Sequence, residues 1–205
     1  MQGDFYPSLP QKVQIHIPNA EQWLKKGFDY TVKSFSNGQR TIWNEKNYRP
    51  IVDWMSDNDG KGLLITGSCG LGKTLIGTYI LPQVINYFCR KVVMCCDANE
   101  INTRADELMK YHLLSIDDIG TEERVNLYGN KRMVFPELVD AAEKKGHLLI
   151  ITTNLNVDEL RQKYGDRSIS RLRAITKFVP FTGEDLRGKR KDIVKNNIKT
   201  RRYVI

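Results

Sequence analysis

Short apolar segments alternate with amphipathic segments along most of the chain. Five apolar runs have the length of buried strands: 62–66, 91–96, 111–116, 147–152 and 176–181. Segments of helical character lie before and between them: 43–55, about 75–88, 99–109, 130–145, 157–164 and 168–173. Apolar strands separated by helices form parallel sheets. The pattern therefore predicts a three-layer α/β/α fold with a five-stranded parallel sheet.

The first 42 residues lack this periodicity. Prolines at positions 7, 10 and 18 interrupt them, whereas Trp23, Phe28 and Phe35 are apolar enough to pack against the rest of the chain. We therefore treat residues 1–42 as an N-terminal extension and expect the main domain to begin at residue 43.

A glycine-rich loop follows the first predicted strand. Residues 67–74 read GSCGLGKT, which fits the phosphate-binding pattern G-x-x-x-x-G-K-[ST] between a strand and a helix. In such loops backbone amides surround a phosphate, the lysine reaches the β- and γ-phosphates, and the last hydroxyl binds Mg²⁺. The sequence therefore predicts ATP and Mg²⁺ as cofactors. The residues expected to contact the nucleotide are Gly67, Ser68, Cys69, Gly70, Leu71, Gly72, Lys73, Thr74 and Leu75.

Polar residues follow the next two strands that can adjoin this loop. Asp117 and Asp118 come directly after the apolar run at 113–116. We predict that Asp117 binds Mg²⁺ together with Thr74, and that Asp118 orients the attacking water. Two aspartates that cap the next helix are the alternative. Asn154 follows the strand at 147–152 and is expected to contact the water or the γ-phosphate, although asparagine is also common in turns.

Three arginines, at positions 167, 171 and 173, lie on the short helix beyond these residues. They form either a solvated helix face or an arginine finger, which is a guanidinium offered to the γ-phosphate of a neighbouring subunit.

Charge is unevenly distributed along the chain. The net charge is +8, and residues 187–205 contain eight Lys or Arg residues against one Asp, a net of +7. We expect a basic C-terminal tail at 188–205 that contacts nucleic acid or an acidic partner, with a solvated terminus as the alternative.

Several other classes of protein are disfavoured. No apolar run is long enough to span a bilayer and the first residues lack a signal pattern, so we expect a cytoplasmic protein without a membrane partner. The four cysteines lack the spacing of zinc ligands, so we expect reduced and mostly buried thiols.

The order of these motifs resembles the AAA+ ATPases of the DnaC/DnaI/IstB group, which are replicative helicase loaders and transposition helper ATPases. The resemblance covers residues 43–187 and rests on GSCGLGKT, LLSIDDIG, IITTNLN, GDRSISRLR and the closing FTGEDLR. It implies Walker A at Lys73 and Thr74, Walker B at Asp117 and Asp118, sensor 1 at Asn154, and the arginine finger at Arg171 with Arg167 as a second arginine of that motif.

The sequence departs from this group in three ways. The segment before residue 43 is short and has no cysteine, too few residues follow Arg187 for a full helical lid, and Asp118 stands where glutamate is usual. The lid is therefore expected to be reduced or absent, and the assignment of Arg187 to sensor 2 is a guess.

The resemblance implies a Mg²⁺-dependent ATPase that acts as a DNA replication accessory protein of the helicase-loader type. Its expected partners are DNA, single-stranded by preference, a replicative helicase, and further copies of itself. Two alternatives stay open: an IstB-like transposition helper that binds a transposase, and a nucleotide-dependent switch with negligible turnover. A metabolic kinase is disfavoured because no site for a small acceptor is recognisable.

Overall fold

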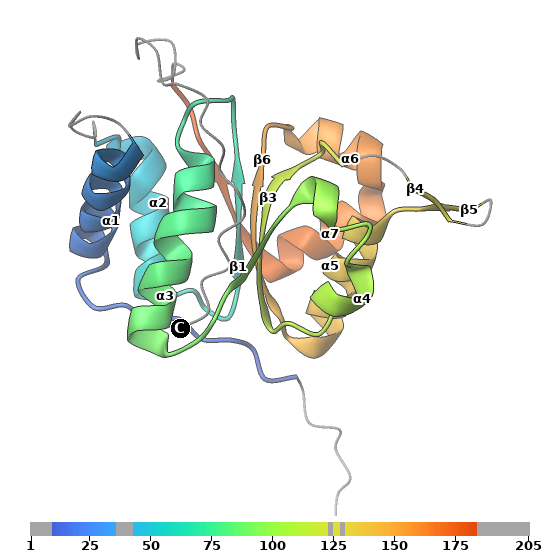
Figure 1. The fold of residues 1–205 in the computed structure, drawn as a ribbon, viewed down its shortest axis with the longest axis horizontal. Coiled ribbons are helices and arrows are strands. Elements are labelled where there is room, and N and C mark those ends of the chain that lie inside the picture. Colours follow the sequence, from blue (N-terminus) through green and yellow to red (C-terminus); the bar gives the residue numbers. More distant parts are fainter. Residues whose placement is uncertain (1–9, 36–42, 123–124, 128–129, 184–205) are drawn as a thin grey trace, which may run out of the picture.

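The computed structural model describes residues 10–35, 43–122, 125–127 and 130–183. Its central sheet has five parallel strands in the order β2-β3-β6-β1-β7 (Figure 1). The strands are β1 (Gly62–Thr66), β2 (Met94–Asp97), β3 (Leu113–Ile119), β6 (Leu148–Thr153) and β7 (Thr176–Pro180). The predicted five-stranded parallel sheet is confirmed, and β3 is longer than predicted because it runs through both aspartates.

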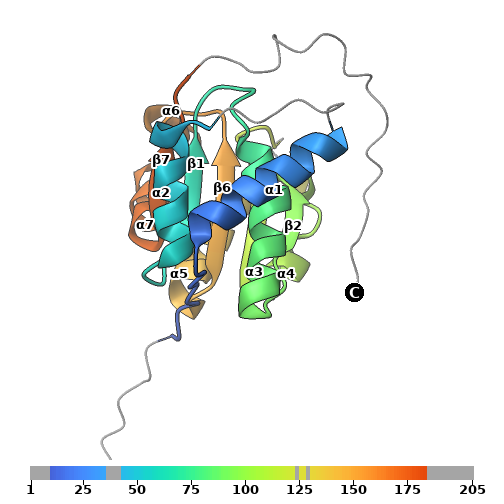
Figure 2. The same cartoon turned by 90° about the vertical axis from the view of Figure 1, so that its left-hand side faces the viewer.

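Helices cover both faces of this sheet (Figures 1 and 2). One face carries α1 (Ala20–Phe35), α2 (Glu45–Ser56) and the helix after the glycine loop, which ends in α3 (Leu81–Cys89). The other face carries α4 (Ala105–Leu108), α5 (Val134–Lys145), α6 (Val157–Tyr164) and α7 (Asp166–Ile175). Among the described helices, none has the length and apolar character needed to cross a membrane.

The strands are apolar throughout because each of their faces meets a layer of helices. Leu63 and Ile65 of β1 pack in the core under α1, α2 and α3, whereas Leu64 packs in the core on the α5 side. This alternation follows from the two-residue period of a strand. All five residues of β1 are buried, which explains why the sequence shows a continuous apolar run rather than alternating polarity.

Helix α1 was not predicted, although its buried residues Ala20, Leu24, Phe28 and Thr31 recur at helical spacing. The prolines precede the helix, and Leu24 and Phe28 lie in the same core as Trp54 of α2. At Gly27 the helix comes so close to the chain beneath it that a Cβ would lie 2.5 Å from Cγ2 of Ile80. The prediction that Trp23 and Phe28 pack against the rest of the chain is confirmed.

The helix after the glycine loop contains a π-helical segment, Leu75–Ile80, before it continues as α3. Pro82 lacks an N–H, so the carbonyl of Gly77 has no donor five residues ahead. Ser115 of β3 replaces that donor, with its hydroxyl 2.9 Å from the Gly77 oxygen. Gly77 also permits close packing, because a Cβ there would lie 2.8 Å from Cγ2 of Thr152. The helix is thereby fixed directly against β3 and β6.

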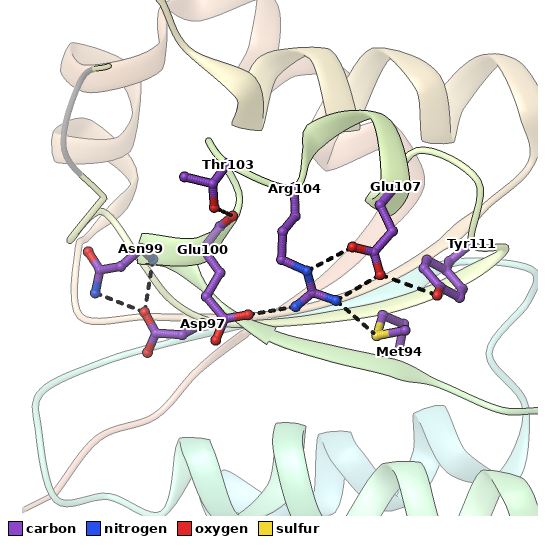
Figure 3. Close-up of polar contacts among 8 residues, drawn as sticks. All are labelled: Met94, Asp97, Asn99, Glu100, Thr103, Arg104, Glu107 and Tyr111. Carbon is purple, nitrogen blue, oxygen red and sulfur yellow. Dashed lines mark hydrogen bonds and ion pairs between the residues drawn. The ribbon is translucent and has the colours of Figure 1, made fainter. Parts of the chain in front are cut away.

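The predicted helix at 99–109 is interrupted. A 3₁₀ turn at Ala98–Glu100 precedes the single turn of α4, and the Thr103 hydroxyl bonds to the Glu100 carbonyl at 2.9 Å, which competes with helical bonding. The Arg104 guanidinium joins the two pieces, with contacts of 2.6 Å to Glu100 and 2.9 Å to Glu107 (Figure 3). These hydrogen bonds hold the pKa of Arg104 above its usual value.

The predicted helix at 130–145 begins later than expected. Residues Val125–Leu127 (β4) and Asn130–Arg132 (β5) form an antiparallel hairpin beside the main domain (Figure 1), and α5 begins at Val134. Residues 184–205 lie outside the described residues, as do the predictions made for Arg187, the lid and the basic tail.

Candidate nucleotide site

Three adjacent strands end at one edge of the sheet, where the polar residues predicted from the sequence converge. Strand β6 lies between β1 and β3, and its Thr153 pairs with Thr66 of β1 and with Ile119 of β3. The glycine loop follows β1, Asn154 follows β6, and Asp117 and Asp118 lie near the end of β3. Open parallel sheets form their ligand sites at this edge.

Three glycines of the loop have φ angles that other residues rarely adopt. Gly67, Gly70 and Gly72 have φ angles of 134°, 79° and 87°. At Gly67 a Cβ would lie 2.4 Å from the carbonyl oxygen of Phe181, so glycine is required there on steric grounds as well. Successive amides in such a loop can point inward and bind an anion.

The other predicted nucleotide contacts differ in exposure. Ser68 and Cys69 are exposed at the tip of the loop, so Cys69 does not fit the expectation of mostly buried thiols. Leu71 is buried in the core, which leaves its backbone to face a ligand. Thr74 and Leu75 are half-buried in the first turn of the following helix.

Lys73 is buried, and its ammonium group binds oxygen atoms. It donates to the carbonyl oxygens of Gly67 at 2.6 Å and Ser68 at 2.8 Å, and to Oδ1 of Asn154 at 2.8 Å. A buried ammonium is stable where each donor finds an acceptor. The lysine is thus held over the loop by the loop itself and by the neighbouring strand.

Asn154 connects the loop to the acidic strand. While its Oδ1 accepts from Lys73, its Nδ2 donates to Oδ1 of Asp118 at 2.6 Å. A carboxamide is suited to this position because it carries an acceptor for a cation and a donor for an anion. Three residues predicted independently from three strand ends are therefore in direct contact.

The two aspartates lie in a β-bulge, where the pairing of β3 with β6 shifts between Ile116 and Ile119. Asp118 has a φ of 59°, in the left-handed region that few residues other than glycine adopt. Thr152 of β6 stabilises this arrangement. Its hydroxyl donates to Oδ1 of Asp117 at 2.5 Å and accepts the Asp118 N–H at 2.9 Å. The bulge thereby presents both carboxylates at the strand end instead of directing them to opposite faces.

The chain beyond Asp118 is anchored to α6 by contacts that the sequence analysis missed. The Glu122 carboxylate accepts from the N–H of Gly120 at 2.8 Å and from the hydroxyl of Tyr164, and Lys163 lies 3.4 Å away. Burial and this acidic neighbour raise the pKa of Tyr164. Lys163 also donates to the Gly120 carbonyl. Because these partners are about forty residues apart, no local sequence signal indicates them.

Solved structures of similar fold share this arrangement of strands and helices. The crystal structure of the DnaC helicase loader matches with a TM-score of 0.51 at 18% identity, over 87% of this chain and 95% of that chain. The replication initiator DnaA bound to AMPPCP and single-stranded DNA gives 0.53 at 16% identity, over 70% and 49%. AMPPCP-bound DnaA from Aquifex aeolicus gives 0.51 at 17% identity, over 68% and 48%. The chain has the AAA+ fold.

No protein-family model matches the sequence, and no curated protein matches it. At the identities found, the structural likeness establishes the fold. The predicted fold class, an AAA+-type α/β/α fold with helices on both faces of a five-stranded parallel sheet, is therefore confirmed.

Arg171, the predicted arginine finger, binds residues outside the cluster around Lys73. It projects from α7 toward α5, where its guanidinium binds Asp140 and lies 3.2 Å from Glu143. This hydrogen bond lowers the pKa of Asp140 and raises the pKa of Arg171. Within the AAA+ fold of a single chain, Arg171 is thus not part of the cluster around Lys73. Arg167 and Arg173 of the same helix are exposed.

Three aromatic residues that the sequence analysis did not assign to the site pack together beside the glycine loop. Tyr48 of α2 lies in ring contact with Trp43 and Phe181, with centroid separations of 5.1 and 5.8 Å. Asn47 fixes the chain after β7 by accepting the N–H of Thr182 at 2.9 Å and donating to its carbonyl at 3.0 Å. These two hydrogen bonds hold the chain that follows β7 beside the start of the glycine loop.

Proposed function

We propose that the chain binds Mg·ATP at this edge of the sheet, hydrolyses it, and acts as an ATP-dependent DNA replication protein of the helicase-loader type. The observation that carries the proposal is the contact of Lys73, Asn154 and Asp118 across the ends of β1, β6 and β3. Phosphate binding and water activation need an ammonium, a carboxamide and a carboxylate close together, which this contact provides. Residues that served only as turn residues would not need to contact one another.

The residues present fit a nucleotide. The three loop glycines free the backbone amides to surround a phosphate, and the helix that begins after them adds its N-terminal partial charge. The ammonium of Lys73 binds two loop carbonyls and Asn154, and phosphate oxygens are stronger acceptors of the same kind. Lys73 therefore stabilises the charge of the β- and γ-phosphates by exchanging acceptors.

The donor set also fits Mg²⁺. The Thr74 hydroxyl and the Asp117 carboxylate are oxygen ligands, and Mg²⁺ commonly takes only one or two protein ligands together with phosphates and waters. When bound, the metal neutralises charge on the phosphate oxygens. Thr152 holds the Asp117 carboxylate in place through its hydroxyl at 2.5 Å.

We propose that Asp118 acts on the attacking water. Its backbone N–H is bonded to Thr152 and its Oδ1 to Asn154, and a carboxylate held in this way can accept a proton from water as it attacks. Asn154 also bonds to Lys73, so it keeps the carboxylate and the ammonium at a fixed separation. We propose that Arg171 completes the site from a neighbouring subunit, where its guanidinium balances charge on the γ-phosphate.

The loader assignment rests on the extent of the similarity. The matched region covers 95% of the chain of the DnaC helicase loader, whereas it covers about half of DnaA. A nucleotide-dependent switch is the second candidate. It is favoured by the side chain of Asp118, which is one methylene shorter than the glutamate usual at this position in the group that the sequence resembles.

Steady-state hydrolysis of ATP with and without Mg²⁺ tests the enzymatic part of the proposal. We expect Mg²⁺-dependent turnover by the unaltered chain and none by Lys73→Ala. Lys110→Ala is the matched control, because Lys110 is exposed just after α4 and its substitution removes the same charge outside the proposed nucleotide site. Tight ATP binding without turnover would support the switch, and unchanged ATP affinity in Lys73→Ala would exclude the nucleotide site.

A pull-down tests the partner. The ATP-bound chain is offered a hexameric replicative helicase and, separately, a transposase. Retention of the helicase supports the loader, and retention of the transposase alone supports the transposition helper.

A further inference from the structure

Helix α1 lies beside α3 (Figure 2), and three aromatic rings of these two helices form a cluster in which Tyr87 is exposed and Trp23 and Phe88 are partly buried. Trp23 of α1 contacts Phe88 edge-on at 5.0 Å and Tyr87 at 5.5 Å, and the last two contact each other at 4.9 Å. Tyr87 is 59% exposed although it belongs to this cluster. Tyr87 is fourteen residues beyond Lys73 in nearly continuous helix, so the cluster lies roughly 20 Å from the glycine loop.

Cations lie over these rings. The Lys26 ammonium is 4.5 Å from the centroid of the Trp23 ring, and the Arg90 guanidinium is 5.9 Å from that of Tyr87. Lys91 is exposed next to Arg90. We call these six residues the aromatic–basic surface: Trp23, Lys26, Tyr87, Phe88, Arg90 and Lys91.

Basic residues outnumber acidic ones around this surface. Residues 81–96 contain no Asp or Glu. On α1, Glu21 lies about 160° around an ideal helix from Trp23 and is paired with Lys25 and Arg49. Asp29 is three residues beyond Lys26 and lies beside it on the helix surface. The aromatic–basic surface therefore combines the exposed ring of Tyr87 with a positive net charge.

We propose that the aromatic–basic surface binds single-stranded nucleic acid. Proteins that bind single strands without sequence preference combine aromatic rings, on which bases stack, with cations that follow the phosphates. Here the exposed Tyr87 supplies the ring on which a base can stack. The charges come from Lys26, Arg90 and Lys91. A duplex hides the faces of its bases, so stacking favours the single strand. This goes beyond the proposed function because it uses none of the residues of the nucleotide site.

Fluorescence anisotropy of a labelled 20-nucleotide oligo(dT) with the full chain, without nucleotide, tests the ring contacts. We expect Tyr87→Ala to weaken binding about tenfold, because one stacked base is lost. Tyr87→Phe keeps the ring and is expected to bind within about twofold of the unaltered chain. Thermal unfolding of both variants checks the fold. Because Tyr87 is exposed, we expect both variants to unfold near the midpoint temperature of the unaltered chain.

The salt dependence of the same titration tests the charges. Arg90→Ala is expected to reduce the slope of log affinity against log salt by about 0.7, the value for one phosphate contact on a single strand. Lys110→Ala removes the same charge from an exposed site near α4 and is expected to leave the slope unchanged. The C-terminal segment is present in all variants and contributes equally to each.

Three results would overturn the proposal: no binding of oligo(dT) by the unaltered chain, equal affinity of Tyr87→Ala and Tyr87→Phe, or equal affinity for a duplex of the same length. Loss of the helicase in the pull-down by Tyr87→Ala, with oligo(dT) binding retained, would assign the surface to a protein partner instead. The titrations contain no nucleotide and use none of the residues of the nucleotide site, so a failed ATPase proposal leaves this test intact.

Discussion

The surroundings of Lys73 and Arg171 differ in one decisive respect. Lys73 is buried and bonded to Asn154, which in turn bonds to Asp118, so predicted site residues hold one another. Arg171 is bonded to two carboxylates of α5, which have no predicted role in hydrolysis. The residues proposed to bind the nucleotide are thus in contact within one chain. The arginine must leave its present partners before it can act on any phosphate.

This difference suggests a division of labour between subunits. Ion pairs at a partly exposed position contribute little net stability, so Arg171 can exchange Asp140 for a phosphate at small cost. The buried contacts of Lys73 are fixed by the loop and by β6 and do not depend on another chain. ATP binding should therefore be a property of the monomer, whereas hydrolysis should require assembly.

The largest expected effect is on turnover when the arginine is removed. Arg171→Ala should lower kcat by about 10³-fold, because a guanidinium at the γ-phosphate contributes on this scale. Its affinity for ATP should be unchanged, since Arg171 lies outside the cluster around Lys73. Arg173→Ala, an exposed arginine of the same helix, is the matched control. Normal kcat in Arg171→Ala would remove this residue from the mechanism.

The next largest effect concerns the acidic pair. Asp118→Asn should retain ATP binding and lose about 10²-fold in kcat, because the amide cannot take a proton from water. Asp117→Asn should instead raise the Mg²⁺ concentration needed for half-maximal turnover. Mg²⁺ titration of both variants separates the two roles, and parental kinetics in both would show that neither aspartate serves the reaction.

Alkylation of the cysteines tests the proposed nucleotide site without mutating the proposed catalytic residues. Cys69 is exposed in the loop, whereas burial raises the pKa of Cys95 to about 11 and of Cys96 to about 12. Near pH 8 an alkylating reagent should therefore modify Cys69 well before Cys95 and Cys96. ATP at ten times its Kd should slow that modification about tenfold by mass action. Cys69→Ser identifies the signal by mass spectrometry, and equal rates with and without ATP would place the nucleotide elsewhere.

The smallest effect is expected from loosening the contacts of Arg171. The double variant Asp140→Asn, Glu143→Gln removes both carboxylates that hold the guanidinium within its own chain. The protein concentration that gives half-maximal ATPase activity should fall by about twofold, in keeping with the small worth of surface ion pairs. A rise in that concentration would mean that the carboxylates position the arginine for its neighbour.

The sequence predicted the parts of the fold that depend on local patterns. Strand-length apolar runs and the loop motif located β1, β3 and β6, and the known direction of parallel strands brought Asn154 and the aspartates to one edge. Helix α1 was missed although its buried residues recur at helical spacing from Ala20 to Thr31, because prolines precede it and Gly27 interrupts its apolar face. Glycine at position 27 is explained by the closeness of the helix to Ile80.

Long-range contacts account for most of the remainder. The backbone N–H of Asp118, whose φ is positive, is bonded to Thr152, thirty-four residues away, and Asp140, which binds Arg171, lies thirty-one residues earlier in the chain. The π-helical segment depends on Pro82 together with a hydroxyl from β3. Each of these features results from tertiary packing, so no window of the sequence contains its cause.

A mixing experiment tests most directly the claim that one chain binds ATP and its neighbour completes the site. Arg171→Ala retains Lys73, and Lys73→Ala retains Arg171, so each alone should be nearly inactive. Mixed at equal amounts, some interfaces pair an intact loop with an intact arginine, and ATPase activity should recover in part and rise with total protein concentration. Absence of recovery at every ratio, with assembly confirmed by light scattering, would contradict the account.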